Sequence, residues 1–323
     1  MSRAPRDVGV ARTRASSRLR WLRRDGRRQE TYERSVISDF DRRQPRVTWS
    51  LRLAQGFILI ALVVAGLGPL LWLAKAAVSS AQDTLVQPLA LFPSGVVHWE
   101  NLRRAWEEVQ VGRHLLHSLI AAAGSAFFTV VVAVTGGFVL AILRPRWAPA
   151  LTGLLLATLF IPGIVSLVPL FRNVVSLPFT GGSIINTYWA VWLPAAANAF
   201  FVLIVKRFFE ALPRELFDAA RIDGADPPRL LLYVVLPLSR PIVGVTLLLA
   251  LIGSYRDYLW PLLVLNAADV RPISVALVTM TTNADLGELM AALFLSVLVP
   301  VVLFLAFQRQ FLSGIGTAGS LKG

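Results

Sequence analysis

Cysteine is absent from this sequence, and charged residues are scarce. The lack of cysteine excludes disulfides, thiolate metal sites, cysteine nucleophiles and cysteine-ligated iron–sulfur clusters. Charged residues make up 16% of the chain, against about 25% in an average soluble domain. Hydrophobic residues make up 55%, and the mean hydropathy is +0.63. This composition is typical of a membrane protein.

The motifs of several enzyme classes are missing as well. No lysine follows a glycine, so the chain has no Walker A loop to hold nucleotide phosphates. HExxH and GxSxG are absent too. His114 and His117 have a spacing that would place two metal ligands on one helix face, but no carboxylate is placed to complete a site. We therefore expect no catalytic residue, no bound metal and no cofactor on this chain.

Basic residues gather at the N-terminus. The net charge is +13, lysine appears only at Lys75, Lys206 and Lys322, and residues 1–52 are rich in arginine. This segment has too few large apolar residues to build a core. We interpret it as a disordered cytoplasmic arm close to anionic lipid headgroups. Nucleic-acid binding is the alternative, but no aromatic residues are arranged to stack bases, so we expect no nucleic-acid partner.

Long apolar runs predict an all-α protein with six transmembrane helices, because a span needs about 20 mostly apolar residues. Small residues in the second run suit close helix packing. Pro162–Gly163 and Pro169 interrupt the third run, and Pro194 interrupts the fourth. Such breaks are typical of a pathway through the bundle or of an ordinary kinked helix. The expected spans are 53–78, 115–143, 148–175, 185–208, 238–265 and 287–311.

Arginine and lysine in the short loops predict the orientation. They lie after the second, fourth and sixth spans, which places those loops and both termini in the cytoplasm. Loops 79–114, 176–184 and 266–286 are then external, although Arg103, Arg104 and Arg113 weaken the contrast.

The expected spans contain little that could harvest an ion gradient. Ion-coupled transporters keep carboxylates or bases within the bilayer. The charged pair well inside a span here is Arg256–Asp257. With Tyr255 it could form a relay or a substrate contact, or it could belong to an interfacial belt with Tyr258 and Trp260. The energy for any transport must then come from elsewhere.

A polar segment, the 213–237 loop, separates the fourth and fifth spans. Its residues predict two short helices. Pro213 suits the start of the first, Gly224 suits its C-terminal cap, and Asp226 can cap a second helix that begins with two prolines. One face of the first helix carries Leu216, Ala219, Ala220 and Asp223. This shallow face could dock another protein or pack on its own bundle, and geometry alone favours neither.

The 213–237 loop resembles the EAA loop of binding-protein-dependent ABC importer permeases. That motif reads Glu-Ala-Ala, three residues, Gly, nine residues, Ile, one residue, Leu-Pro. Here Asp218, Ala219 and Ala220, then Gly224, then Val234, Leu236 and Pro237 occupy those spacings. Asp218 replaces the usual glutamate and Val234 the usual isoleucine.

Beyond this loop, about residues 98–323 are similar to the MalG-type permeases of carbohydrate importers. It rests on "WENLRRAW", "LLHSLIAAA", "NTYWAVWLPAAANAFFVLIVKRFFEALPRELFDAARIDGA", "YLWPLLVLN" and "FQRQFLSGIGTAGSLKG". His117 stands where asparagine is usual, and Tyr255–Arg256 where Trp-Asn is usual. An extra residue within 314–316 also departs from the pattern.

The resemblance implies a division of labour. A homologous second permease would complete the pathway, and an ABC ATPase dimer would bind ATP and Mg and hold the EAA helix. An extracytoplasmic binding protein would deliver a sugar or oligosaccharide. The location would be the bacterial plasma membrane. Alternatives are a permease for a polyol or glycerol phosphate and, from the residues alone, an ion-coupled secondary transporter or a non-transporting membrane scaffold.

The expected domains are a basic arm (1–52), a first span with its external loop (53–112), a permease core (113–312) and a flexible tail (313–323). The resemblance implies coupling to the ATPase through Asp218, Ala219, Ala220, Arg221, Asp223, Gly224, Leu236 and Pro237. We expect pathway or substrate contacts at Asn198, Tyr255, Arg256 and Asp257. The resemblance also implies tail contacts to the ATPase through Gly316, Thr317, Gly319 and Lys322.

Overall fold

The structure, a computed structural model, describes residues 45–282 and 284–320, with side chains from 47 to 308. The described residues form helices, turns and loops without a strand, which confirms the all-α prediction. The chain divides into two compact units, 1–66 and 67–323. The expected disordered arm lies mostly outside the described residues.

Three continuous helices are long and apolar enough to cross a membrane. The first is α2 (Pro45–Ala77), whose residues 47–66 lie in the first unit. The second joins α5 (Val111–Phe138) to a π-helical turn, η1 (Val139–Leu143). The third is α16 (Leu286–Ser320). They correspond to the predicted first, second and sixth spans.

Three bent pairs of helices complete six candidate spans. The pair α6 (Ala148–Thr158) and α7 (Gly163–Val175) bends by 106° at the Pro162–Gly163 break. The pair α8 (Trp189–Ala196) and α9 (Ala199–Glu210) bends by 44°. The third pair bends by 82° where the end of the 213–237 loop meets α13 (Arg240–Arg256). The predicted break at Pro162–Gly163 is therefore present, and the fourth span bends just after α8, which contains Pro194, whereas Pro169 lies within the continuous helix α7.

The fifth predicted span, 238–265, is wrong as a continuous helix. The helix α13 ends at Arg256, and Asp257 adopts an extended backbone before α14 (Leu259–Val264). A helix of 17 residues is about 25 Å long, which is slightly less than the hydrocarbon core of a bilayer. Composition could not locate this break because "GSYRDYLWPLL" contains only one proline, four residues beyond it.

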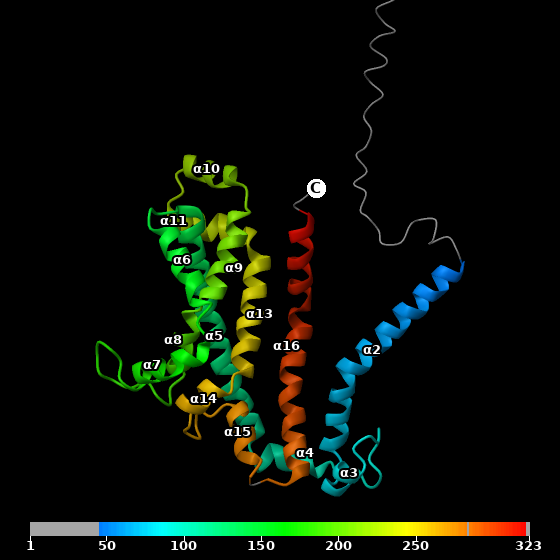
Figure 1. Cartoon of the computed structure of the whole chain (residues 1–323). Helices are drawn as coiled ribbons and strands as arrows, with labels where there is room; N and C mark the ends of the chain where they lie inside the picture. The colour runs from blue at the N-terminus through cyan, green and yellow to red at the C-terminus, as the bar shows by residue number, and fades with distance from the viewer. Residues whose placement is uncertain (1–44, 283, 321–323) are drawn as a thin grey trace, which may run out of the picture. The chain divides into compact units, whose positions relative to one another are not determined.

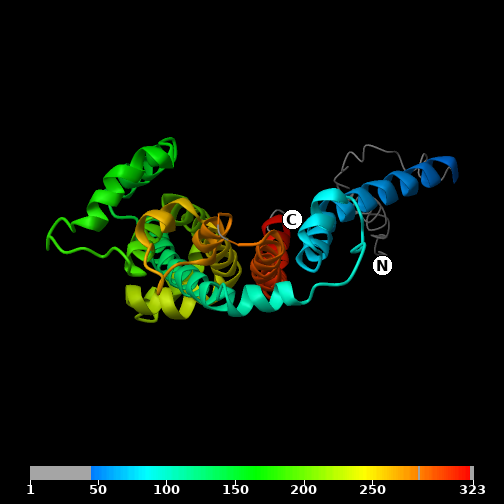
Figure 2. The same ribbon diagram turned by 90° about the horizontal axis from the view of Figure 1, so that it is seen from below.

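In the second unit, α5 packs against α8, α9 and α13, and α13 also packs against α16. Figures 1 and 2 show α13 between α9 and α16. Two glycines of α5 allow close packing. A β-carbon at Gly124 would lie 2.1 Å from the Trp192 ring, and one at Gly137 would lie 3.0 Å from Val205. The predicted role of small residues in this span is confirmed at these two positions.

At the end of the bundle where α15 (Ile273–Met280) lies, a segment predicted as a plain loop contains two short helices (Figure 1). They are α3 (Ala81–Val86) and α4 (Glu100–Glu107). Asn101 Nδ2 donates to the carbonyls of Ala77 and Ser79 at 3.3 and 3.0 Å. Arg104 pairs with Glu288 at 3.6 Å, which joins α4 to α16.

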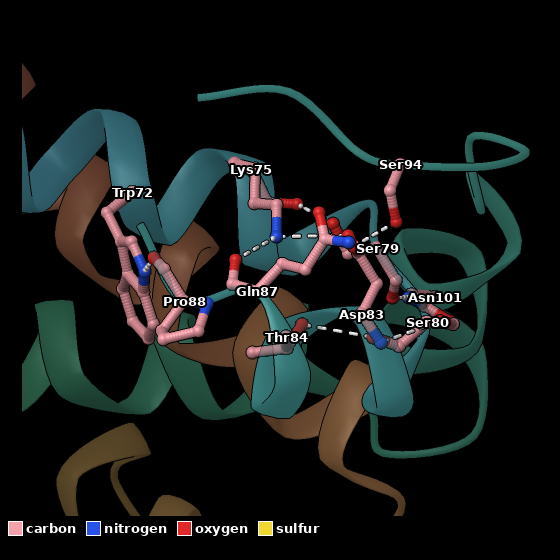
Figure 3. Close-up of polar contacts among 10 residues, drawn as sticks. All are labelled: Trp72, Lys75, Ser79, Ser80, Asp83, Thr84, Gln87, Pro88, Ser94 and Asn101. Carbon is pink, nitrogen blue, oxygen red and sulfur yellow. Dashed lines mark hydrogen bonds and ion pairs between the residues drawn. The ribbon is translucent and has the colours of Figure 1, made fainter. Parts of the chain in front are cut away.

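A buried ion pair holds the turn after α2. Nζ of Lys75 lies near Oδ2 of Asp83 and also donates to the Gln87 carbonyl at 3.3 Å. Ser94 Oγ donates to the other oxygen of the Asp83 carboxylate. Figure 3 shows Lys75 and Ser94 meeting at the Asp83 carboxylate, with the Gln87 carbonyl also contacting Lys75. Lys75 is therefore one polar anchor of the segment that follows the first span.

The end of the chain differs from the expected flexible tail. The backbone of 313–320 continues α16 as helix, and these eight residues contain no proline. The predicted contact residues Gly316, Thr317 and Gly319 lie beyond the described side chains, and Lys322 lies outside the described residues.

Candidate functional site: the 213–237 loop and the cavity at Arg256

The 213–237 loop forms the helix–turn–helix that its sequence predicts. The first helix, α10, runs from Arg214 to Ile222, with Pro213 as its N-cap. Gly224 has φ = +82°, a conformation that favours glycine. The amide of Gly224 donates to the Arg221 carbonyl, and that of Ala225 donates to the Ala220 carbonyl. This left-handed turn ends the helix as a C-terminal cap.

The second helix starts at the predicted cap. Asp226 Oδ1 accepts a hydrogen bond from the Arg229 amide at 2.9 Å, and α11 (Pro227–Arg229) begins with the two prolines. A π-helical turn, η2 (Leu230–Val235), and α12 (Leu236–Leu238) continue it. Pro237 lies within α12, and the span α13 begins three residues later, at Arg240. Leu236 and Pro237 thus lie just before the 82° bend.

Phe217 anchors α10 to the rest of the bundle. It is the buried residue of this helix, with 5% of its surface exposed, and it joins the core cluster that contains Phe209 and Leu230. Ala220 packs against the same cluster, so it does not lie on one face with Leu216 and Ala219 as predicted. One side of α10 therefore packs on its own bundle, and docking of this helix to another protein stays a prediction.

The other side of α10 presents apolar surface to its surroundings. Ile222 is 86% exposed and Leu216 is 43% exposed, and Ala219 and Asp223 are exposed beside them. This face is left open by the described residues. Contiguous exposed apolar surface of this kind, rather than a single exposed side chain, is what indicates a protein-contact surface.

The Asp218 side chain is engaged within its own helix. Its Oδ1 accepts from Arg221 Nη1 at 3.1 Å, in an i, i+3 pair. Both residues line a cavity of 190 Å³ between α10 and the ends of η1 and α9. The resemblance implies a coupling role for Asp218, and within this chain its carboxylate pairs with Arg221.

A larger cavity lies at the far end of α13. Its volume is 560 Å³, and residues of α5, α8, α9, α13 and α14 line it. Of the four residues predicted for a pathway, Asn198, Arg256 and Asp257 line this cavity. Tyr255 is separated from them, because it is 8% exposed and its hydroxyl donates to the Ser296 carbonyl at 2.8 Å. Adjacent residues of a helix point about 100° apart, which the sequence prediction overlooked for Tyr255 and Arg256.

The two histidines of α5 have different partners. His114 Nδ1 lies 2.8 Å from the Arg271 carbonyl oxygen, and His117 Nδ1 lies 2.6 Å from the Tyr188 hydroxyl. Among the described residues, no group of three His, Asp or Glu side chains is placed to hold a metal ion.

Sequence reasoning missed two features of this site. Phe217 could have been found as the large aromatic side chain in an otherwise polar helix. The pair Lys206–Glu210, with 2.6 Å between Nζ and Oε1, has the i, i+4 spacing of a helix ion pair and lies beside Phe209 of the core cluster.

The helical bundle and its helix–turn–helix define the fold of an importer permease. The structure superimposes on a chain of a bacterial ABC transporter involved in the import of the acidic polysaccharide alginate, with a TM-score of 0.71. The match covers 83% of this chain and 99% of that chain at 18% sequence identity, so it shows a common fold.

The chain belongs to the family of binding-protein-dependent transport system inner membrane components, whose model matches residues 133–316. Similar proteins include the sn-glycerol-3-phosphate transport system permease protein UgpE of Agrobacterium fabrum, 28% identical over 84% of this chain and 95% of that protein. The arabinooligosaccharides transport system permease protein AraQ of Halalkalibacterium halodurans is 29% identical over 86% and 98%. The chain is therefore a multi-pass membrane permease of an ABC importer.

Proposed function

We propose that this permease carries a sugar or a sugar derivative and that α10 couples it to an ABC ATPase. The observation that carries the proposal is the exposed apolar face of α10, with Ile222 at its end and Phe217 buried on the opposite side. A helix held from one side and open on the other is suited to a cleft on a second protein.

The other subunits follow from the same proposal. A second permease would complete the pathway, and an extracytoplasmic binding protein would supply the solute. ATP and Mg would bind to the ATPase dimer, since this chain has no Walker A loop. The 213–237 loop and both termini would face the cytoplasm, and α3 and α4 would lie on the opposite side.

The carbohydrate class is supported by relatives that are named as permeases for arabinooligosaccharides and for melibiose, raffinose and stachyose. A polyol phosphate is the second candidate, supported by the glycerol-phosphate relatives and by Arg256 in the cavity. The ion-coupled secondary transporter, an alternative from the residues alone, is no longer favoured, because the chain belongs to a binding-protein-dependent family.

The coupling proposal is tested by purifying the tagged chain from its native membrane and identifying the proteins that accompany it. We expect an ATPase and a second permease. Ile222→Asp should release the ATPase, because a carboxylate would have to be desolvated in the cleft. Tyr233→Asp is the matched control, since Tyr233 is 76% exposed in the same loop but outside α10.

Equal recovery of the ATPase with both variants would contradict docking through the α10 face. Purification of this chain alone, active in proteoliposomes without an ATPase, would contradict the importer function itself.

A further inference from the structure

The strongest unexplained feature of the cavity is the charge on Arg256. This residue lines the 560 Å³ space, is exposed to it, and makes no ion pair with any residue that the structure describes. It ends α13, within a segment that sequence composition assigns to a span. An unpaired charge near membrane depth is costly and is typical of a functional site.

The neighbouring carboxylate of Asp257 forms no ion pair with Arg256 among the contacts of the described residues. Asp257 has an extended backbone and directly precedes α14. Its main-chain carbonyl accepts from Ser274 Oγ at 2.9 Å, which fixes the residue between α13 and α15. Asp257 is therefore engaged in positioning the break between α13 and α14.

The remaining polar groups of the cavity are mostly donors. Asn198 Oδ1 accepts a hydrogen bond from the Phe200 amide, which leaves the Asn198 NH₂ group as a donor for a bound solute. The Ser254 hydroxyl has no hydrogen-bond partner among the described residues. By contrast, Thr129 and Trp260 already donate to the carbonyls of Ala195 and Ala190. The free groups at this cavity are thus an amide, a hydroxyl and a guanidinium.

We propose that Arg256 binds an anionic group, a carboxylate or a phosphate, on the transported carbohydrate. A guanidinium presents two parallel N–H donors to such a group, and the amide and hydroxyl nearby add donors of matching polarity. A neutral sugar would bring no counter-charge to this guanidinium. The inference rests on the proposed importer function and adds the charge of the solute to it.

The test uses the complete transporter with its binding protein in proteoliposomes loaded with ATP. The probes are glycerol 3-phosphate, digalacturonate and the neutral trisaccharide maltotriose. We expect ATP-dependent uptake of an anionic probe and not of maltotriose. Arg256→Gln should lower this uptake at least tenfold while the complex still assembles, and Arg256→Lys should retain part of it. Arg172→Gln is the matched control, because Arg172 is exposed on α7 and does not line the cavity.

Several outcomes would overturn the inference. Uptake of maltotriose that is insensitive to Arg256→Gln would refute it and leave the importer function intact. A loss that is the same for every solute and follows the phosphatidylglycerol content of the vesicles would assign Arg256 to a lipid headgroup. Loss of the second permease from the Arg256→Gln complex would assign it to an acidic residue of that subunit. No ATP-dependent uptake of any probe would refute the inference and the proposed function together.

Discussion

Nζ of Lys75 lies 3.0 Å from Oδ2 of Asp83, with 4% and 7% of the two side chains exposed. The pair connects the end of α2 to the helix that follows it, and Ser94 completes the coordination of the carboxylate from eleven residues further on. The first span is thereby tied to the polar segment after it through one buried charge pair.

Breaking this pair from one side should destabilise the protein more than removing it altogether. Asp83→Asn leaves the Lys75 ammonium buried without a counter-charge, whereas Lys75→Met with Asp83→Leu replaces both charges by apolar groups. We expect the lower melting temperature for the single variant, measured by thermal unfolding in detergent. If the double variant were less stable than Asp83→Asn, the two side chains would stabilise the protein by more than pairing their charges.

The same carboxylate predicts a pH dependence. Hydrogen bonding from Ser94 and the ammonium of Lys75 lower the pKa of Asp83 from its ordinary value near 3.8 to about 2. Because the folded state has the lower pKa, its contribution to stability is complete above about pH 4 and disappears as the pH falls towards 2. The melting temperatures of the wild type and Asp83→Asn should therefore converge across this range. A constant difference between them would contradict the shift.

Gly224 should tolerate asparagine better than proline. Its φ of +82° is one that asparagine adopts more readily than other non-glycine residues, whereas proline requires φ near −65° and loses the amide that bonds the Arg221 carbonyl. We expect Gly224→Pro to abolish ATP-coupled uptake while membrane insertion persists, and Gly224→Asn to retain measurable uptake. Full-rate uptake by Gly224→Pro would show that this turn has no role in coupling.

A single methyl group at Gly124 should disturb the contact between α5 and α8. Its β-carbon would meet the Trp192 ring at 2.1 Å, so the helices must separate or the ring must move. We expect Gly124→Ala to cost about 1–3 kcal/mol of stability. Gly153→Ala is the matched control, because a β-carbon there has no neighbour within 4 Å and alanine favours helix. Similar stability of the two variants would contradict the close packing.

The elements that depend on local chemistry were predictable from the sequence. Gly224, Asp226 and the prolines after it act within one helical turn, so the caps of the 213–237 loop follow from residue type. The small residues of α5 likewise predict close packing, although the sequence does not identify Trp192 as the residue that contacts Gly124. The presence of the breaks at Pro162 and before α9 was also foreseen.

Features that depend on contacts distant in sequence were not predictable. The inward position of Tyr255 depends on the Ser296 carbonyl, 41 residues away. The end of α13 depends on Asp257, whose carbonyl is held by Ser274. Ala220 was grouped on one face with Leu216 and Ala219, and spacing along a helix does not reveal that Ala220 meets the bundle.

The attachment of α10 through Phe217 has a mechanical consequence. Ile222 lies five residues beyond this anchor, or about 7 Å along the helix axis. A tilt of about 10° around the buried ring would displace Ile222 by roughly 1 Å, while Ala225 and the turn at Gly224 carry the movement towards α11. If a partner protein tilted α10, the buried ring would be the fixed point of the movement, and its distance from the exposed end of the helix would set how far that end travels for a given tilt.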